Sequence, residues 1–493
     1  MRLLIIIFLA ILSLNCSSRS FFVTEVKNDS FAEAIIAKEG MNLVGVVSDG
    51  ATPIQGVVVS DGYSVTATDK DGVYQIAADK RAKFVFVSVP ADCEIPIDGN
   101  NFPKMYQTIN PIDTGKMLRY DFTLKKTKKV EKFTLLAFAD VQIQNSTDLD
   151  LLSTDIPKIK DYVKTLVSPV YGISLGDQVW DNMPYMQQYA EEMGKIGIPV
   201  FPLIGNHDHN QKIKNNDEGA SSDFETNFGP TYYSYNIGDC HFVVLDDILY
   251  NGRKDYTGEI TKNQLDWLRE DLKYIGRDKL IIVALHIPTK RRQNNSGITN
   301  AQALYDILEG YKVRILSGHA HYNFATTISD KIEENSLGSV MGAGWSGDLC
   351  SDGSPRGYGV YEIDGNNISS HYYKGTNHER NYQMYLYNMG DAVSPDLRDG
   401  LIFNIFAWHT TWTVKVYEDN VYKTTLTDNI KEKDRRAFDY MDGPDKPVYR
   451  PGNEPTMNND HMFYYKPSSE SWSTIRVEAI DPYGNVYTQS INR

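Results

Sequence analysis

The sequence predicts a layered α/β core flanked by two all-β sandwich domains. A chain of 493 residues allows about three domains at roughly 150 residues each. Its 41% apolar and 12% aromatic content is enough to form packed cores and excludes a disordered chain. Apolar runs alternate with helix-like segments only in the central part. Short alternating strands with turn residues precede and follow that part.

Charge and cysteine content exclude two further classes of protein. The 50 basic and 64 acidic residues leave a formal charge of −14, so we expect no nucleic-acid binding. Four cysteines in a chain of this length cannot form a disulfide framework. Cys93, Cys240 and Cys350 are interpreted as small buried hydrophobic residues.

Residues 1–16 have the pattern of an export signal. Arg2 precedes an apolar run from Leu3 to Leu12, which is too short for a membrane-spanning helix of about 20 residues. The segment ends in Ser-Leu-Asn-Cys, which resembles a bacterial lipoprotein cleavage box with Cys16 as the lipidated residue. We therefore expect an exported lipoprotein of the cell envelope, anchored through Cys16 in the periplasm or at the cell surface. A plain secretory signal cleaved nearby is the alternative.

The first all-β domain is expected at residues 21–128. Short alternating strands are separated by turns that contain Asp-Gly, as in small sandwiches. The segment Thr68–Ile76 (TDKDGVYQI) resembles the carboxypeptidase regulatory-like family of sandwiches. The strands are expected at 42–48, 55–60, 63–68 and 73–77.

The central domain is expected at residues 129–378. The lysine-rich segment Lys125–Lys132 reads as a solvated linker at its start. Continuous apolar runs imply strands that are covered on both faces, and amphipathic stretches between them imply covering helices. The strands are expected at 133–139, 171–175, 198–204, 241–245, 280–285 and 313–316, and the helices at 150–167, 183–196 and 261–275. The second all-β domain is expected at residues 379–493, where Tyr and Trp are frequent and strand patterns return.

Polar motifs follow the apolar runs of the central part. Ligands of open α/β sheets lie at the carboxyl ends of the strands, so these motifs are expected to meet at one site. Asp, Asn and His are suitable ligands for Mn²⁺, Fe, Zn²⁺ or Mg²⁺, and there are enough of them for two ions. In chain order the motifs are Asp140-Val141-Gln142, Gly176-Asp177-Gln178-Val179-Trp180-Asp181, Gly205-Asn206-His207-Asp208, His286 and Gly318-His319-Ala320-His321.

This order of motifs resembles the calcineurin-like metallophosphoesterase family, over roughly residues 133–325. The resemblance implies an αββα sandwich and two divalent metal ions bridged by Asp177. It implies that Asp140, Gln142 and His321 complete one metal site, and that Asn206, His286 and His319 complete the other. It also implies that His207 is the catalytic histidine and that Asp208 orients its imidazole. Asp181 is expected to have a structural or supporting role.

One position departs from the commonest family pattern, because Gln142 stands where histidine is usual. A glutamine is also found there in relatives resembling Mn-dependent ADP-ribose/CDP-alcohol diphosphatases. A neutral amide oxygen is a weaker donor than an imidazole nitrogen, so we expect Mn²⁺ in preference, with Fe, Zn²⁺ or Mg²⁺ as alternatives.

Two further segments are candidates for substrate binding. Arg291 and Arg292 follow Lys290 shortly after His286, so they are expected on the rim of the site, where they could attract an anion. A solvated loop is the alternative interpretation. Trp345, in a glycine-rich segment resembling one of exported bacterial phosphoesterases with extra sandwich domains, could form a wall of the pocket, or be a buried tryptophan above a turn.

The sequence thus predicts an exported dimetal phosphoesterase acting on a small phosphorylated substrate. A metal-bridging hydroxide would attack phosphorus while His207 assists the leaving group. A phosphodiester or diphosphate is favoured over a monoester by the resemblance at Gln142. The alternative is a catalytically decayed lipoprotein that binds glycan or protein through its β-modules, but such a protein would have lost metal ligands.

Overall fold

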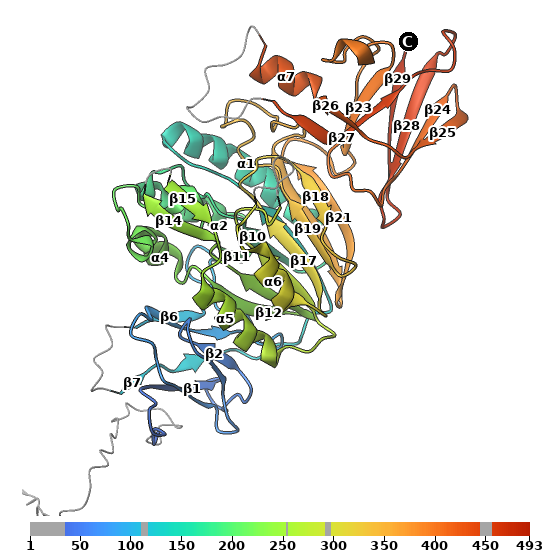
Figure 1. The fold of residues 1–493 in the computed structure, drawn as a ribbon. Coiled ribbons are helices and arrows are strands. Elements are labelled where there is room, and N and C mark those ends of the chain that lie inside the picture. Colours follow the sequence, from blue (N-terminus) through green and yellow to red (C-terminus); the bar gives the residue numbers. More distant parts are fainter. Residues whose placement is uncertain (1–34, 110–116, 253–254, 291–296, 444–455) are drawn as a thin grey trace, which may run out of the picture.

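The structure is a computed structural model that describes residues 35–109, 117–252, 255–290, 297–443 and 456–493. Figure 1 shows three parts in a row, with an N-terminal β-domain, a central domain of strands and helices, and a C-terminal β-domain. Cys16 lies outside the described residues. No helix of the described part is both long and apolar enough to cross a membrane.

The N-terminal domain packs two small sheets against each other. One has the order β4-β1-β7 with β8 also on β1, and comprises β1 (Leu43–Ser48), β4 (Val73–Ile76), β7 (Leu118–Arg119) and β8 (Phe122–Thr123). The other has the order β3-β2-β5-β6, and comprises β2 (Val58–Ser60), β3 (Val65–Ala67), β5 (Phe84–Ser88) and β6 (Tyr106–Thr108).

The central domain contains two mixed sheets. The first has the order β11-β10-β9-β20-β21 and comprises β9 (Lys132–Phe138), β10 (Val170–Ser174), β11 (Val200–Phe201), β20 (Gly357–Asp364) and β21 (Asn367–Gly375). The second has the order β12-β13-β16-β17-β19-β18 and comprises β12 (Tyr233–Ile237), β13 (Cys240–Val244), β16 (Leu280–Ala284), β17 (Lys312–Ser317), β18 (Phe324–Thr327) and β19 (Ile332–Ser336). A separate hairpin joins β14 (Ile248–Gly252) to β15 (Asp255–Gly258).

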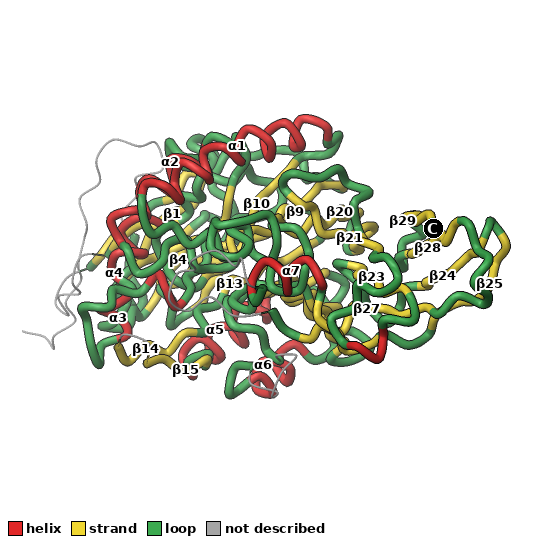
Figure 2. Tube along the Cα trace, turned by 90° about the horizontal axis from the view of Figure 1, so that it is seen from above, coloured by secondary structure: helices red, strands yellow, loops and turns green. Residues whose placement is uncertain are grey.

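Helices cover both sheets on their outer faces. Figure 2 shows α1 and α2 on one side of the sheets and α5 and α6 on the other. The alternation in β9 explains its continuous apolar run, since Leu135 and Ala137 pack toward the second sheet while Leu136 and Phe138 pack with the first two helices. The helices are α1 (Ser146–Thr165), α2 (Met186–Gly194), α3 (Asp217–Ala220), α4 (Ser222–Phe228), α5 (Lys262–Asp271) and α6 (Ala301–Leu308), with short 3₁₀ turns at Met183–Tyr185, Asn206–Asp208 and Leu272–Tyr274. The predicted αββα layering is confirmed.

The C-terminal domain is a second β-sandwich. One sheet has the order β22-β23-β27-β26 and comprises β22 (Met384–Leu386), β23 (Leu401–Ile405), β26 (Ile430–Lys433) and β27 (Asn458–Tyr465). The other has the order β25-β24-β28-β29 and comprises β24 (Thr413–Glu418), β25 (Val421–Leu426), β28 (Thr474–Ile480) and β29 (Val486–Asn492). A 3₁₀ turn at Pro395–Leu397 and helix α7 (Arg435–Met441) complete the domain.

Both β-domains are fastened to the core. On the N-terminal side, the indole N–H of Trp267 donates to Ser60 and the Trp267 ring packs edge-on against Phe86, within one continuous hydrophobic core. On the C-terminal side, buried Asp352 of the core faces His461 of β27, with 3.2 Å between Oδ2 and Nε2. A buried contact of this kind favours one packing arrangement, because the buried carboxylate would lose a hydrogen-bonding partner in any other arrangement.

One predicted strand is much shorter than expected. The apolar sequence at 198–204 predicts a full strand, but only Val200–Phe201 forms β11. Pro199 and Pro202 flank this dipeptide and lack the N–H group that a ladder needs, so pairing stops at both. The helix predicted at 150–167 instead begins at Ser146, because Asn145 caps it by accepting a hydrogen bond from the Asp148 N–H.

Candidate dimetal centre

The polar motifs meet at the carboxyl ends of five core strands. Loops after β9, β10, β11, β16 and β17 bring together all of the predicted metal ligands: Asp140, Gln142, Asp177, Asn206, His286, His319 and His321. Two groups within the described residues have ligand atoms close enough to hold an ion, namely Asp177 with His286 and His319, and Asp140 with Asp177 and His321. Asp177 belongs to both groups. This edge therefore holds two adjacent groups of side chains that share one carboxylate and are each able to hold a cation.

In the first group, three nitrogen and oxygen ligands converge around His286. Its Nε2 lies 3.1 Å from Asn206 Oδ1, 3.1 Å from His319 Nδ1 and 3.4 Å from Asp177 Oδ1. The other ring nitrogen, Nδ1, lies 2.8 Å from the Leu175 carbonyl, to which it must donate. Once Nε2 loses its proton to a bound cation, that hydrogen bond leaves its lone pair directed at the shared space, as in metal-binding histidines with a fixed tautomer.

In the second group, Asp140 and His321 face each other, with 3.2 Å between Oδ1 and Nε2. The Gln142 amide lies between the groups, its nitrogen 2.8 Å from Asp177 Oδ2 and 3.2 Å from His321 Nε2. Only the amide oxygen can bind a cation, so ligation by Gln142 requires the oxygen to face the ion. The glutamine is thus in place for the role that the family resemblance implies, and that role stays a prediction.

Glycines in the motifs allow the ligands to pack this closely. A Cβ at Gly205 would lie 2.3 Å from Asp177 Oδ1, and one at Gly318 would lie 2.8 Å from Asp140 Oδ2. Any larger residue at these positions would therefore displace a carboxylate.

The backbone is strained where the ligands lie. Five of the predicted ligands have a positive φ between 52° and 65°, namely Asp140, Gln142, Asp177, His319 and His321. This left-handed conformation is costly for residues with a Cβ and is concentrated at functional sites in proteins. The fold therefore holds these side chains in one place at a cost in stability.

The electrostatics of the centre favour a bound cation. Burial alone lowers the pKa of His286, yet Asp177, Asp140 and Asp247 together raise it to about 10. Burial raises the pKa of Asp177, but His286 and His207 bring it well below the usual range. Asp140 Oδ1 is buried and, apart from the His321 Nε2 atom 3.2 Å away, has no polar partner in the described part of the chain. Buried carboxylates that hold a proton on a neighbouring imidazole would equally hold a metal ion, so these residues fit two divalent cations.

His207 lies beside the metal ligands but is held by other residues. Its Nδ1 is 2.7 Å from Asp181 Oδ1, its ring stacks on Trp180 at 4.4 Å, and its backbone N–H donates to Asp177. Burial lowers the pKa of His207, whereas Asp177 and Asp181 raise it more. The imidazole is therefore oriented and biased toward its protonated form.

The role predicted for Asp208 is wrong. Its Oδ1 accepts from the Val179 N–H at 3.1 Å and its Oδ2 accepts from the Gly205 N–H at 2.8 Å, so both oxygens face the backbone. Asp208 clamps two of the motif loops together, and Asp181 provides the contact with the His207 ring that was assigned to Asp208. The side chain of Asp208 turns away because residues 206–208 form a 3₁₀ turn.

Sequence analysis missed Asp247, which supports the loop that carries His286. Its two carboxylate oxygens accept from the backbone N–H groups of His286 and Ile287 at 3.0 and 2.8 Å. Burial raises the pKa of Asp247 to about 7. The available signal was an Asp-Asp pair directly after the apolar strand β13, the same pattern that identified the other motifs.

The predicted substrate residues fare differently. Arg291 and Arg292 lie outside the described residues. Trp345 is only 7% exposed, and its indole N–H donates to the Val141 carbonyl at 2.8 Å. It supports the loop between Asp140 and Gln142, and its contact with substrate stays a prediction.

Family models describe most of the chain. The model named calcineurin-like phosphoesterase matches residues 133–323, its N-terminal companion matches 41–127 and its C-terminal companion matches 334–487. The last match begins in β19, so it includes two strands of the first central sheet as well as the C-terminal sandwich.

Two curated relatives match parts of the central region. A "Probable cyclic nucleotide phosphodiesterase" of Rhodococcus erythropolis is 28% identical over 139 residues, covering 27% of this chain and 44% of that protein. "Purple acid phosphatase 13" of Arabidopsis thaliana is 25% identical over 194 residues, covering 36% of this chain and 33% of that protein. The matches thus span less than half the length of these relatives.

Solved structures with similar folds include a dimetal phosphatase from Danio rerio and a 5'-nucleotidase from Candida albicans. The first is 16% identical with a TM-score of 0.35, over 47% of this chain and 93% of that one. The second is 14% identical with a TM-score of 0.30, over 51% of this chain and 53% of that one. The three family models and the two adjacent Asp/His groups lead to one conclusion: the chain belongs to the calcineurin-like phosphoesterases, metal-dependent enzymes that hydrolyse phosphoesters at a dimetal centre.

Proposed function

We propose that the chain hydrolyses a phosphodiester or diphosphate bond in a small phosphorylated substrate, with Mn²⁺ as the preferred metal. The observation that carries the proposal is the sharing of Asp177 between two groups of ligands, because two adjacent cations suit an in-line displacement at phosphorus. Bound there, two such ions would neutralise phosphoryl oxygens and supply a hydroxide near neutral pH. The likeness to a "Probable cyclic nucleotide phosphodiesterase" supports the diester part.

The chain's own residues provide orientation and a proton. Asp181 and Trp180 fix the plane of the His207 imidazole, so its Nε2 edge keeps one direction. The pKa of His207 is raised because Asp177 and Asp181 outweigh the effect of burial, which keeps a proton available for the leaving oxygen. Asp247 and Asp208 hold the loops that carry the ligands.

Hydrolysis rates with a panel of substrates test the proposal. Purified protein, depleted of metal and resupplied with Mn²⁺, is assayed with bis-p-nitrophenyl phosphate, a nucleoside diphosphate sugar and p-nitrophenyl phosphate. We expect a higher kcat/KM for the diester or the diphosphate than for the monoester. Asp177→Asn should abolish all of the activity, and Asp306→Asn, on the exposed face of α6, should leave it unchanged. A preference for the monoester would contradict the proposed substrate class.

A further inference from the structure

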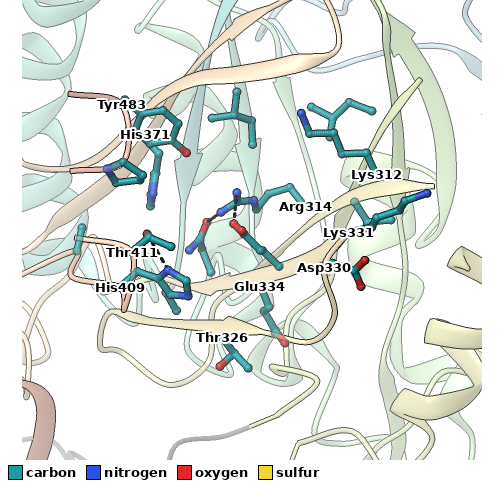
Figure 3. A pocket seen from close by; sticks show the side chains of 18 of the residues that line it. Lys312, Arg314, Thr326, Asp330, Lys331, Glu334, His371, His409, Thr411 and Tyr483 are labelled. Carbon is teal, nitrogen blue, oxygen red and sulfur yellow. Dashed lines mark hydrogen bonds and ion pairs between the residues drawn. The ribbon is translucent and has the colours of Figure 1, made fainter. Parts of the chain in front are cut away.

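A second cavity lies where the core meets the C-terminal sandwich. It has a volume of about 470 Å³, within the range of small-molecule sites (Figure 3). One wall comes from core strands β17, β18, β19 and β21, and the other from the loops at 407–412 and 482–483 of the C-terminal domain. Neither domain alone would enclose it.

This cavity is separate from the dimetal centre. The metal ligands follow the carboxyl ends of β16 and β17, whereas the cavity is lined by Leu280 and Lys312, the first residues of these two strands. None of the predicted metal ligands lines the cavity.

Polar groups inside the cavity have hydrogen-bonding capacity to spare. The Arg314 guanidinium contacts Glu333 and Asn335, but its Nε–H is buried without an acceptor among the described residues. His371 Nε2 is likewise buried without a partner in the described part of the chain. Burial, helped by nearby Arg314, lowers the pKa of His371 to about 3, so its ring is neutral. Buried polar atoms of this kind are costly unless a ligand or water satisfies them.

Hydroxyl groups and flat rings complete the interior. Thr326, Thr411 and Tyr483 line it (Figure 3). Trp412 also lines it, with its ring stacked on Tyr487 at 5.7 Å, and so presents a rigid apolar surface. A cavity with rigid rings, hydroxyl groups and a guanidinium N–H that lacks an acceptor suits a hydroxylated ring.

Three cations of the rim form no ion pair with an acid among the described residues. Lys312, Lys331 and Arg277 bind only uncharged oxygens in the described structure, namely Asn367 Oδ1 and the carbonyls of Gly310 and Glu309. Among the described lining residues, the acids are Asp330, Glu333 and Glu334, against the four cations Arg277, Lys312, Arg314 and Lys331. Glu333 pairs with Arg314, and Glu334 is buried and accepts hydrogen bonds from Thr289 and Ser317. In a chain of net charge −14, this local excess of positive charge favours an anionic group at the mouth.

We propose that this cavity binds a sugar carrying a phosphate or a carboxylate. The sugar hydroxyls would accept from Arg314 and bond to His371, its ring would lie against Trp412, and the anionic group would face Lys312 and Lys331. Because both domains line the cavity, the ligand would also stabilise their contact.

Calorimetric titration of the full-length holoenzyme tests this site. The probes are glucuronate, the phosphonate analogue of glucose 6-phosphate, neutral glucose and acetate. We expect glucuronate or the phosphonate to bind at least tenfold more tightly than glucose or acetate. Equal binding of glucose would overturn the anionic part of the proposal, and equal binding of acetate would overturn the sugar part.

Variants separate this site from the dimetal centre. Lys312→Gln/Lys331→Gln and, separately, Thr411→Trp should each weaken binding at least tenfold, with hydrolysis of a small chromogenic ester unchanged. Lys160→Gln, on the exposed surface of α1, is the matched control and should bind as the wild type does. If tight binding persists in both Lys312→Gln/Lys331→Gln and Thr411→Trp, the probe binds elsewhere, as at the dimetal centre, and the proposal is overturned. The proposal is also overturned if none of the probes binds.

Discussion

The Nδ1 atom of His207 lies 2.7 Å from Oδ1 of Asp181, four residues after the shared ligand Asp177. One loop after β10 thus supplies both the carboxylate common to the two metal groups and the carboxylate that orients the His207 imidazole. A movement of this loop would displace Asp177 and the His207 imidazole together.

Replacing His207 should slow turnover without removing metal. The His207 side chain is directed to Asp181 and Trp180, whereas Asn206 faces His286, so His207→Ala should keep both metal ions. Loss of a general acid typically lowers kcat by about 10²–10⁴-fold. The measurement compares esters with good and poor leaving groups, and the loss should be larger for the poor one. An equal kcat for wild type and variant on the poor leaving group would contradict the role.

Asp181→Asn should lower kcat because His207 would lose its orienting carboxylate. Loss of such a supporting partner costs about 10–100-fold in activity. The melting temperature should change little, since Asp181 is at the rim of the site with 18% of its side chain exposed. Kinetics and thermal unfolding measured on the same sample check this. Unchanged kcat with lowered stability would assign Asp181 a purely structural role.

Asp208→Asn should have the opposite effect to Asp181→Asn: it should lower the stability of the protein more than it lowers kcat. The asparagine amide can replace only one of the two accepting oxygens, so one backbone N–H, of Val179 or Gly205, would lose its partner. A buried unsatisfied group costs about 1–3 kcal/mol in the free energy of unfolding. Urea unfolding should show this loss, with kcat of the folded, metal-loaded variant changed less than in Asp181→Asn. A larger loss of kcat in Asp208→Asn than in Asp181→Asn would show that Asp208, and not Asp181, orients the His207 imidazole.

Gln142→His should change metal preference. An imidazole nitrogen binds Zn²⁺ and Fe more strongly than an amide oxygen does, so the group with Asp140 and His321 should hold metal more tightly. In the wild type, the two ions should leave at different chelator concentrations. Activity should disappear when the ion held by Asp140, Gln142 and His321 leaves. The titration follows metal content and activity together. If both ions leave together and the substitution alters neither affinity nor preference, Gln142 is not a ligand.

Stability should depend on pH through Asp352 at the contact between core and C-terminal domain. Burial raises the pKa of Asp352, but His461 and Ser354 lower it below the ordinary 3.8. Its stabilisation is therefore complete above pH 3.8 and is lost as the pH falls further. Removing the carboxylate leaves buried hydrogen-bonding partners without their acceptor, so Asp352→Asn should lower the urea midpoint at pH 7, and by less near pH 3. An equal difference at both values would contradict the assignment.

The sequence predicts those features of the structure that depend on residues adjacent in the chain. Continuous apolar runs located β9, β10, β13, β16 and β17, because strands covered on both faces need apolar residues throughout. The polar residues at their ends located the dimetal centre. Strand β19 was missed because its sequence, IEENS, is polar. Its buried Glu334 is stabilised by hydrogen bonds from Thr289 and Ser317, which no local pattern shows.

Side-chain direction was the harder part. Asp208 adjoins His207 in sequence, yet its carboxylate faces the backbone of two other loops, and Asp181 reaches the imidazole from a distance of 26 residues. The cavity between the domains was also beyond prediction, since its walls come from residues as far apart as Arg277 and Tyr483. Tertiary packing alone brings these together.

Metal content per chain, measured together with activity in wild type and in Asp177→Asn, tests the central claim most directly. Asp177 is common to both groups of ligands, so the active wild-type protein should contain two divalent ions per chain. Asp177→Asn should retain neither ion at the concentrations that saturate the wild type, and should be inactive. Full activity of a metal-free protein, or two ions and wild-type activity in Asp177→Asn, would contradict it.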